Sequence, residues 1–173
     1  MENRDRKLNR LPNYDYFQNG LYFITICTKD REKILSEVIS VGDGVLDVPK
    51  YELTEYGKIL NDQIIEMNSI YIKSRIIKYV IMPDHLHMII NLFDENNVFC
   101  GTSRTPSPTN AVIPSIISTL KRFVNKKTGF NIWQRSYHDY IIRSEKEFLE
   151  ICDYIDNNPI NWVNDIYNQN YWR

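Results

Sequence analysis

Two short apolar segments joined by only two residues limit the folds open to this chain more than any other feature. Residues 75–83 and 85–93 are rich in β-branched and other apolar side chains, and they meet at Pro83-Asp84. Runs of this length and composition predict β-strands, and Pro and Asp favour a tight turn between them. The centre of the chain is therefore expected to hold two strands with a tight connection.

Strand and helix patterns alternate on both sides of this strand pair. Apolar residues at three- and four-residue intervals predict amphipathic helices, and β-branched or aromatic runs predict strands. Ser or Thr followed three residues later by Glu predicts a helix start, and Pro predicts a helix end. The predicted elements are a strand at 21–28, a helix at about 54–69 with Thr54 as N-cap, a helix at about 112–127, a strand at 132–143, and a helix that begins at Ser144 with a capping box to Glu147 and stops before Pro159.

Apart from a hairpin predicted at 33–48 around Gly42-Asp43-Gly44, the order of elements is β-α-β-β-α-β-α. Split βαβ units of this kind fold as a ferredoxin-like antiparallel sheet with both helices on one face, which leaves the other face for a third helix or a substrate. The expected class is α+β. We expect one domain over 1–173, with a basic arm at 1–13, a mobile loop at 94–110 and a C-terminal tail at 160–173.

The basic residues are concentrated in the middle of the chain. The whole sequence has 21 Lys and Arg against 22 Asp and Glu, and its net charge of −1 argues against a generally basic nucleic-acid-binding protein. Residues 68–143, however, carry 10 basic and 4 acidic side chains, and residues 144–173 carry 2 basic and 6 acidic ones. A local positive surface is therefore compatible with the near-neutral total.

The cysteines and the apolar runs exclude several classes of protein. Cys27, Cys100 and Cys152 form no CxxC pair, which excludes a zinc ribbon and argues against a secreted disulfide framework. No apolar run approaches the roughly 20 residues of a membrane helix, and the polar start does not resemble a signal peptide. The expected location is the reducing cytoplasm, without membrane contact.

The motif that bears on chemistry is His85-Leu86-His87, at the start of the second central strand. Side chains at i and i+2 point to the same face of a sheet, so the two imidazoles would lie side by side while Leu86 enters the core. Two imidazoles and one oxygen donor can bind a divalent cation and leave positions open for substrate. A bare pair of this kind is more often two histidines with ordinary hydrogen bonds, so the motif alone does not establish a metal site.

Residue chemistry alone does not select a nucleophile. Tyr154 lies on the third predicted helix, and Asn158 follows on the same face one turn later. A tyrosine that attacks phosphorus would form a phosphotyrosyl intermediate, and an adjacent metal would polarise the phosphate. Because the chain has 12 tyrosines, any single one is structural by default.

Five segments together carry a resemblance to a known family: YDYFQNGLYFITICTKDRE (14–32), LTEYGKIL (53–60), YVIMPDHLHMII (79–90), IWQRSYHDYIIR (132–143) and YIDNNPINW (154–162). With these segments, in this order, the chain resembles the REP-associated tyrosine transposases. These are relatives of the insertion-sequence-200-like single-tyrosine transposases of the HUH endonuclease superfamily. The segments span nearly the whole chain, and their combination is specific.

The resemblance implies a ferredoxin-like domain that nicks single-stranded DNA near a hairpin, such as a REP-like repeat or an element end. His85 and His87 match the metal-binding histidines of the family, Tyr154 matches its catalytic tyrosine, and Asn158 stands where the third metal ligand is placed. The implied chemistry uses Mg²⁺ or Mn²⁺, passes through a covalent 5′-phosphotyrosine and leaves a 3′-OH for strand transfer. His138 could assist as a proton carrier or ligand.

Basic and aromatic residues of the middle segment are candidate contacts to DNA. Lys and Arg bind phosphates and aromatic rings stack on bases, although both kinds are also common on solvated helix faces and in cores. The acidic third helix could be held against the basic middle of the chain until DNA competes. The candidates are Lys121, Arg122, Lys126, Lys127, Arg135 and Arg143 for phosphates, and Trp133 and Tyr137 for bases.

Three functions stay open from the sequence. They are an active single-strand DNA nickase and strand transferase, a catalytically silent or host-domesticated DNA-hairpin binding protein, and a metal-binding enzyme unrelated to DNA. The intact pair of histidines with Tyr154 and Asn158 favours the first over the second. The basic middle and the WQRSYHD segment argue against the third. Both a monomer and a homodimer are compatible with the resemblance.

Overall fold

The computed structural model describes residues 19–39, 50–93 and 112–168, without the side chains of Ile39, Lys50 and residues 163–168. Its main sheet has four strands in the order β4-β5-β1-β6, and every neighbouring pair is antiparallel. This is the predicted ferredoxin-like order of a β-α-β-β-α-β chain. The strands are β1 (Gly20–Cys27), β4 (Ser74–Ile81), β5 (His85–Leu92) and β6 (His138–Ile142).

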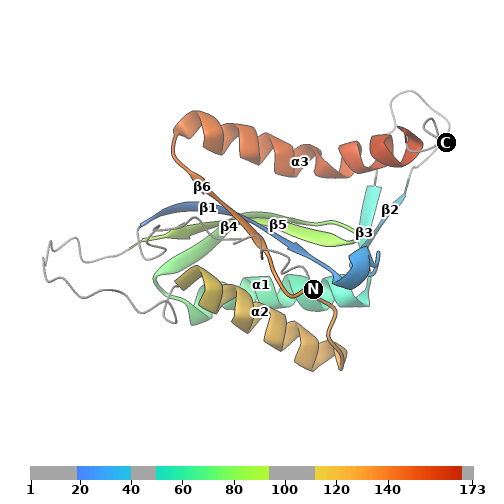
Figure 1. The fold of residues 1–173 in the computed structure, drawn as a ribbon, viewed down its shortest axis with the longest axis horizontal. Helices are drawn as coiled ribbons and strands as arrows, with labels where there is room; N and C mark the ends of the chain where they lie inside the picture. The colour runs from blue at the N-terminus through green and yellow to red at the C-terminus, as the bar shows by residue number, and fades with distance from the viewer. Residues whose placement is uncertain (1–18, 40–49, 94–111, 169–173) are drawn as a thin grey trace, which may run out of the picture.

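Helices cover both faces of this sheet (Figure 1). Helix α1 (Glu55–Ile70) and helix α2 (Val112–Thr128) lie on one face, and helix α3 (Glu145–Asn168) lies on the other. The two-helix face and the third helix are both as predicted. Thr54 caps α1 by accepting a hydrogen bond of 3.2 Å from the backbone N–H of Gly57, also as predicted.

Alternation along the strands divides the core between the two faces. Even-numbered residues of β1 and β5 pack against α1 and α2, whereas odd-numbered residues face α3. The cluster under α1 and α2 is the larger one, and it is almost entirely aliphatic. Its strand members include Tyr22, Ile24, Ile26, Leu86, Met88, Ile90 and Leu92.

The inserted hairpin differs from the prediction in its second strand. Strand β2 (Ser36–Ile39) pairs with β3 (Lys50–Leu53), so the partner strand lies beyond the predicted hairpin at 33–48. The predicted turn at Gly42-Asp43-Gly44 lies outside the described residues. The backbone N–H of Thr54 donates to the carbonyl of Leu35, which draws the last residues before α1 into the pairing.

Leu35 links this hairpin to the turn in front of β5. Its N–H donates to the carbonyl of Pro83 at 3.0 Å, while its own carbonyl accepts from Thr54 at 3.1 Å. The backbone of Gly57 packs so closely here that a Cβ at that position would lie 1.9 Å from the carbonyl oxygen of Leu35. Glycine is therefore needed at this approach. The contacts of Leu35 hold the Pro83-Asp84 turn in place. The turn itself is closed by a hydrogen bond of 2.8 Å from the backbone N–H of Met82 to the carbonyl of His85.

The fourth strand is shorter than predicted. The segment 132–137 forms only an isolated bridge, between Trp133 and Thr28, and β6 begins at His138. Lys121 explains part of the difference, because its ammonium donates to the carbonyls of Gln134 at 2.8 Å and Ser136 at 3.0 Å. A side chain thus takes up backbone acceptors there.

Helix α3 is longer than predicted and passes through Pro159. A proline inside a helix removes one backbone hydrogen bond and disfavours helical geometry at the preceding residue. Tertiary packing outweighs this cost, since Asn158 and Pro159 are both buried against the sheet and Trp162 contacts a strand residue. The predicted tail at 160–173 is accordingly helical up to Asn168. The predicted arm at 1–13 and loop at 94–110 lie outside the described residues.

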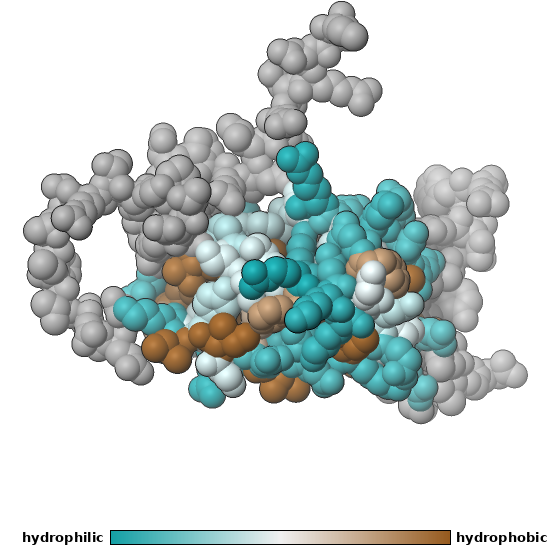
Figure 2. All heavy atoms as spheres, turned by 90° about the horizontal axis from the view of Figure 1, so that it is seen from below, coloured by the Kyte–Doolittle hydropathy of each residue, from teal (hydrophilic) through white to brown (hydrophobic). Residues whose placement is uncertain are grey.

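Figure 2 shows the face formed on the side of α1 and α2, where hydrophilic residues predominate and hydrophobic ones occur in separate patches. This pattern is expected of amphipathic helices, because the apolar sides of α1 and α2 are buried in the core. Within the described ranges, no helix is both long and apolar enough to cross a membrane.

Candidate active site

The two histidines of β5 lie side by side on the face that α3 covers. His85 is paired with Cys27 and His87 with Thr25 across the β5–β1 ladder. Their ring centroids are 4.5 Å apart, and the residues are only 8% and 6% exposed. The intervening Leu86 enters the core on the opposite face. The predicted arrangement of the pair is confirmed.

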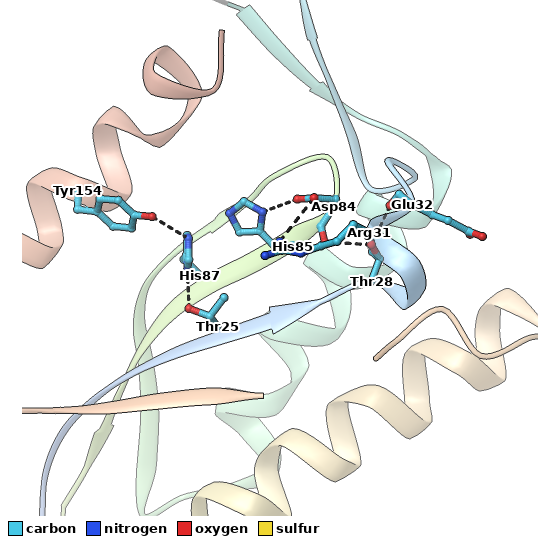
Figure 3. A network of polar contacts seen from close by, with 8 residues as sticks. All are labelled: Thr25, Thr28, Arg31, Glu32, Asp84, His85, His87 and Tyr154. Atoms are coloured by element: carbon cyan, nitrogen blue, oxygen red, sulfur yellow. Dashed lines mark hydrogen bonds and ion pairs between the residues drawn. The ribbon is translucent and has the colours of Figure 1, made fainter. Parts of the chain in front are cut away.

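Each imidazole uses its Nδ1 atom for a contact within the protein (Figure 3). The Nδ1 atom of His85 lies 2.5 Å from Oδ1 of Asp84, and the Nδ1 atom of His87 lies 2.8 Å from the hydroxyl of Thr25. An ionised carboxylate can only accept, so Asp84 places the proton of His85 on Nδ1 and leaves a lone pair on Nε2. Metal-binding histidines are oriented by second partners of this kind.

A strained turn supports the carboxylate of Asp84. Asp30 and Arg31 have φ angles of 52° and 59°, the left-handed region that non-glycine residues rarely adopt. The hydroxyl of Thr28 lies 2.8 Å from the carbonyl of Glu32 and 3.0 Å from that of Asp84, which fixes the turn to the β5 entry. Arg31 then reaches Oδ2 of Asp84 at 3.5 Å. The backbone strain of this turn therefore lies next to the two histidines, and strained residues often cluster at functional sites.

The electrostatics of the site favour a neutral imidazole at His87 and an ionised carboxylate at Asp84. Burial, followed by the charges of His85 and Arg31, lowers the pKa of His87 to about 3. Burial opposes ionisation of Asp84, but the hydrogen bond and charge of His85 together with Arg31 outweigh it and lower the pKa of that carboxyl. Neutral imidazole is the form that binds metal ions.

Tyr154 is brought to the histidines by α3. Its hydroxyl oxygen lies 3.3 Å from Nε2 of His87, and the two ring centroids are 5.3 Å apart. The neighbouring Ile155 is buried and anchors the helix on the sheet, while Tyr154 itself remains 46% exposed. The tyrosine is therefore accessible from solvent and in contact with the histidine pair at once.

Asn158 and Trp162 follow Tyr154 at successive helix turns, on the same side of α3. Tyr154 touches His87, and the ring of Trp162 lies 5.9 Å from that of His85. Asn158 stands between these two contacts and is 6% exposed, so it lies on the stripe of the helix that faces the pair. The structure thus brings Tyr154, Asn158 and both histidines into one region.

Two imidazoles lie together at this point, and the buried amide of Asn158 follows one helix turn after Tyr154. In the part of the chain that the structure describes, no group of three His, Cys, Asp or Glu side chains is placed to hold a metal ion. Asn158 is the predicted oxygen donor that would complete a set with the two imidazoles. Two nitrogen ligands with an amide oxygen suit a divalent cation that keeps open positions.

The predicted DNA contacts divide into different environments. Trp133 is buried at 2% exposure, so its ring presents no free face to a base, whereas Tyr137 is only partly buried and packs against the core beneath α1 and α2. Lys121 donates to two backbone carbonyls, and burial lowers its pKa to about 8. Trp133 is therefore a core residue, and its prediction as a base contact is wrong, whereas Tyr137 and Lys121 stay predicted contacts.

The other predicted contacts are exposed but do not line the histidine pair. Arg122, Lys126 and Lys127 belong to α2, in the layer opposite α3. Arg135 and Arg143 are exposed at the two ends of β6. His138 is exposed as well, and its backbone pairs with Thr25, the residue that also pairs with His87.

One ion pair links the acidic helix α3 to the basic middle of the chain. Lys78 of β4 lies 2.7 Å from Asp156. Of the other acidic residues of α3, Glu150 faces Lys146 of its own helix, and Glu147 accepts from the backbone N–H of Arg143.

Several site residues were not identified from the sequence. Asp84 could have been suspected from its position beside His85, but Thr25 and Arg31 become visible only through strand register and turn geometry. Phe23 was missed for the same reason, although it stacks on His87 with centroids 5.1 Å apart. Trp162 lay in the segment for which no structure was predicted.

Known proteins are similar to this chain over most of its length. No family model matches the chain. An uncharacterized protein of Haemophilus influenzae is 33% identical over 172 residues, 92% of this chain and 91% of that protein. The REP-associated tyrosine transposase of Escherichia coli is 23% identical over 155 residues, 87% of this chain and 74% of that protein.

A solved structure of a REP-associated tyrosine transposase bound to a REP hairpin has the same fold. Its TM-score is 0.60 at 21% identity, over 88% of this chain and 73% of that chain. The motifs around His85 and Tyr154, the named relative and the shared fold agree, and the chain is similar to the REP-associated tyrosine transposases.

Proposed function

We propose that this protein cuts and rejoins single-stranded DNA beside a hairpin and that Tyr154 is its nucleophile. The observation that carries the proposal is the distance of 3.3 Å between the Tyr154 hydroxyl and Nε2 of His87. Within one chain, Tyr154 and His87 lie in contact, which supports a site supplied by a single protomer. The similarity to REP-associated tyrosine transposases supports DNA as the substrate, and the hairpin bound by the solved structure supports the choice of DNA structure.

His85 and His87, through their Nε2 atoms, and Asn158, through its amide oxygen, would hold Mg²⁺ or Mn²⁺. Such a cation polarises a scissile phosphate and offsets the charge that develops on it. The two Nδ1 contacts, to Asp84 and Thr25, keep the imidazoles aimed at this point. The low pKa of His87 keeps that ring in its metal-binding form at neutral pH.

In the proposed reaction the oxygen of Tyr154 forms a bond to phosphorus as the bond from phosphorus to the 3′ oxygen breaks. The hydroxyl proton of Tyr154 leaves to solvent on its exposed side, and the released 3′ oxygen gains a proton from water. The products are a 5′-phosphotyrosine and a free 3′-OH. Attack of a 3′-OH on the phosphotyrosine reverses these changes and joins strands without a nucleotide cofactor.

The test is adduct formation with hairpin oligonucleotides that carry unpaired flanks and a label on the 3′ fragment. We expect a labelled protein band on a denaturing gel, dependent on Mg²⁺ or Mn²⁺ and abolished by EDTA. Tyr154→Phe should abolish the band. Tyr51→Phe, at an exposed position of β3 outside the main sheet, is the matched control and should retain it.

An equal band from Tyr154→Phe and wild type would show that another residue is the nucleophile. Hairpin binding without an adduct, across a panel of repeat hairpins and both metals, would instead support the catalytically silent binding protein.

A further inference from the structure

Part of the sheet face that carries the histidines is not covered by α3. The apolar side of α3 packs on Val80, Ile89 and Ile142, which closes the face over β4, β5 and the end of β6. On β6, however, His138 and Tyr140 also belong to this face and remain exposed, Tyr140 to 47%. An aromatic residue left open on an otherwise covered sheet requires an explanation.

Strand register connects this open area to the active site. His138 pairs with Thr25, which pairs with His87, and Tyr140 pairs with Phe23 in the next row. Directly paired residues have side chains on the same face, and strands are about 4.8 Å apart. His138 and Tyr140 therefore stand two strands, about 10 Å, from β5.

Ring contacts cover the part of this distance that lies between β5 and β1. The ring of Phe23 stacks on His87, with an interplanar angle of 28°, and meets the edge of Tyr154 at 6.1 Å between centroids. Tyr140 is the cross-strand neighbour of Phe23 on the solvent side. Aromatic residues thus follow one another on this face, by ring contact from Tyr154 to Phe23 and by strand register from Phe23 to the exposed Tyr140, and together they form a strip.

A hollow continues the strip beyond Tyr140. It has a volume of about 400 Å³ and lies between the first turn of α3 and the row formed by Leu21 and Ile142, with Arg143 and Phe148 in its lining. From the row of His87 to this row is four residues, about 14 Å, which is room for roughly two to four nucleotides.

We propose that Phe23, His138 and Tyr140 form a stacking platform for the unpaired DNA bases that flank the scissile phosphate, with the hollow at Arg143 as its far end. This inference rests on the proposed function. Exposed aromatic residues on an open antiparallel sheet stack single-stranded bases, and they do so with little regard to sequence. The platform would make the base contacts that the sequence predicts for Trp133 and Tyr137.

Two cations flank the strip, and the hollow at its far end has both Arg143 and Glu145 in its lining. Arg135 precedes β6 and Arg143 follows it, and both are exposed, so a cation lies at each end of the platform. Phosphates of a strand that runs along β6 would meet these two guanidinium groups. The polar edges of His138 and Tyr140 also suit a wet nucleic-acid contact better than a dry protein interface.

The test compares two probes, a DNA hairpin with an unpaired oligothymidine flank and the same hairpin with a blunt end. Binding is measured by fluorescence anisotropy in EDTA, so that no cleavage occurs. We expect Tyr140→Ala to weaken binding of the flanked hairpin about 10-fold and to leave the blunt hairpin unchanged. Tyr140→Phe keeps the ring and should bind both probes like wild type.

Tyr51→Ala removes an equally exposed tyrosine from β3 and serves as the matched control, with unchanged binding of both probes. A second readout places 2-aminopurine in the flank, whose fluorescence should be quenched on binding to wild type and Tyr140→Phe but not to Tyr140→Ala. Equal binding and equal quenching by Tyr140→Ala and wild type would overturn the platform. Equal losses for both probes would overturn it too.

The outcomes separate this inference from the proposed chemistry. A wild-type protein that binds and quenches the flanked probe but forms no adduct with Mn²⁺ would retain the platform and overturn the nuclease. A wild-type protein that binds neither probe would overturn both.

Discussion

The two faces of the central sheet differ, although the same strands supply them: the face towards α1 and α2 is almost entirely apolar, whereas the face towards α3 combines apolar residues with the two histidines. On β5, Leu86, Met88 and Ile90 face α1 and α2 and are fully buried among aliphatic residues. The alternate positions His85 and His87 face α3 and carry hydrogen bonds instead. Two helices close the first face, whereas one helix covers the second and leaves Tyr154 and Tyr140 exposed.

This difference shows how stability and chemistry are separated in one layer of backbone. Apolar burial on the closed face is non-directional and supplies most of the free energy of folding. The polar groups of the other face are costly to bury unless each finds a partner, and Asp84 and Thr25 are those partners. Neighbouring substitutions on β5 should therefore have effects of different kind.

The largest effect is expected for His87→Ala. This change removes a proposed metal ligand and the contact of Tyr154, so adduct formation should fall by more than about 100-fold. Thermal melting should change little, since the ring lies outside the large aliphatic core. Adduct formation near the wild-type rate would contradict the place given to His87.

Leu86→Ala, one residue away, should do the reverse. Loss of a fully buried leucine from the core under α1 and α2 should lower the free energy of unfolding by about 2–5 kcal/mol. Adduct formation per folded molecule should stay close to wild type. Urea denaturation and gel assays on the same preparations measure both quantities. A stable Leu86→Ala variant with lost activity would break the separation of the two faces.

Asp84→Asn tests how far the proposed metal site on the face towards α3 depends on a residue that does not contact the substrate. The amide keeps the shape but weakens the hold on Nδ1 of His85 and removes the ion pair with Arg31. Affinity for Mn²⁺ should fall about 10- to 100-fold. Calorimetric titration of metal measures this, with the exposed ion-pair variant Lys146→Met as control. Unchanged affinity would reduce Asp84 to a structural turn residue.

Element order and face alternation could be predicted from the sequence because they depend on local pattern. The periodic apolar residues of α1 and α2 and the alternation around Leu86 follow from the repeats of helix and strand. The placement of both histidines on one face followed from the same rule. The closed face was therefore almost fully predictable.

The face towards α3 could not be predicted in this way, because its contacts join residues that are distant in sequence. Thr25 meets His87 only through the β1–β5 register, and Arg31 meets Asp84 only through two left-handed residues. Trp133, Tyr137 and Tyr140 are all aromatic residues of one segment, so the sequence does not distinguish them. Only the fold determines which of these rings is buried. The passage of α3 through Pro159 likewise depends on packing that overrides local preference.

The smallest expected effect concerns Lys121, a charged group of the layer that closes the apolar face. Burial lowers its pKa to about 8 from an ordinary value of 10.5, so between these pH values the unfolded chain binds a proton that the folded chain does not. The free energy of unfolding should therefore gain a contribution from Lys121 as the pH rises from 8 to 10.5. Lys121→Met lacks this contribution, and wild type should gain stability relative to the variant across this window in urea titrations. Lys126→Met, which removes an exposed ammonium from the same helix, is the matched control. The stability difference between wild type and Lys121→Met would contradict this prediction if it stayed constant from pH 8 to 10.5. The ammonium would then be solvated in both the folded and the unfolded state, and the layer of α1 and α2 would admit more water than the contacts of Lys121 indicate.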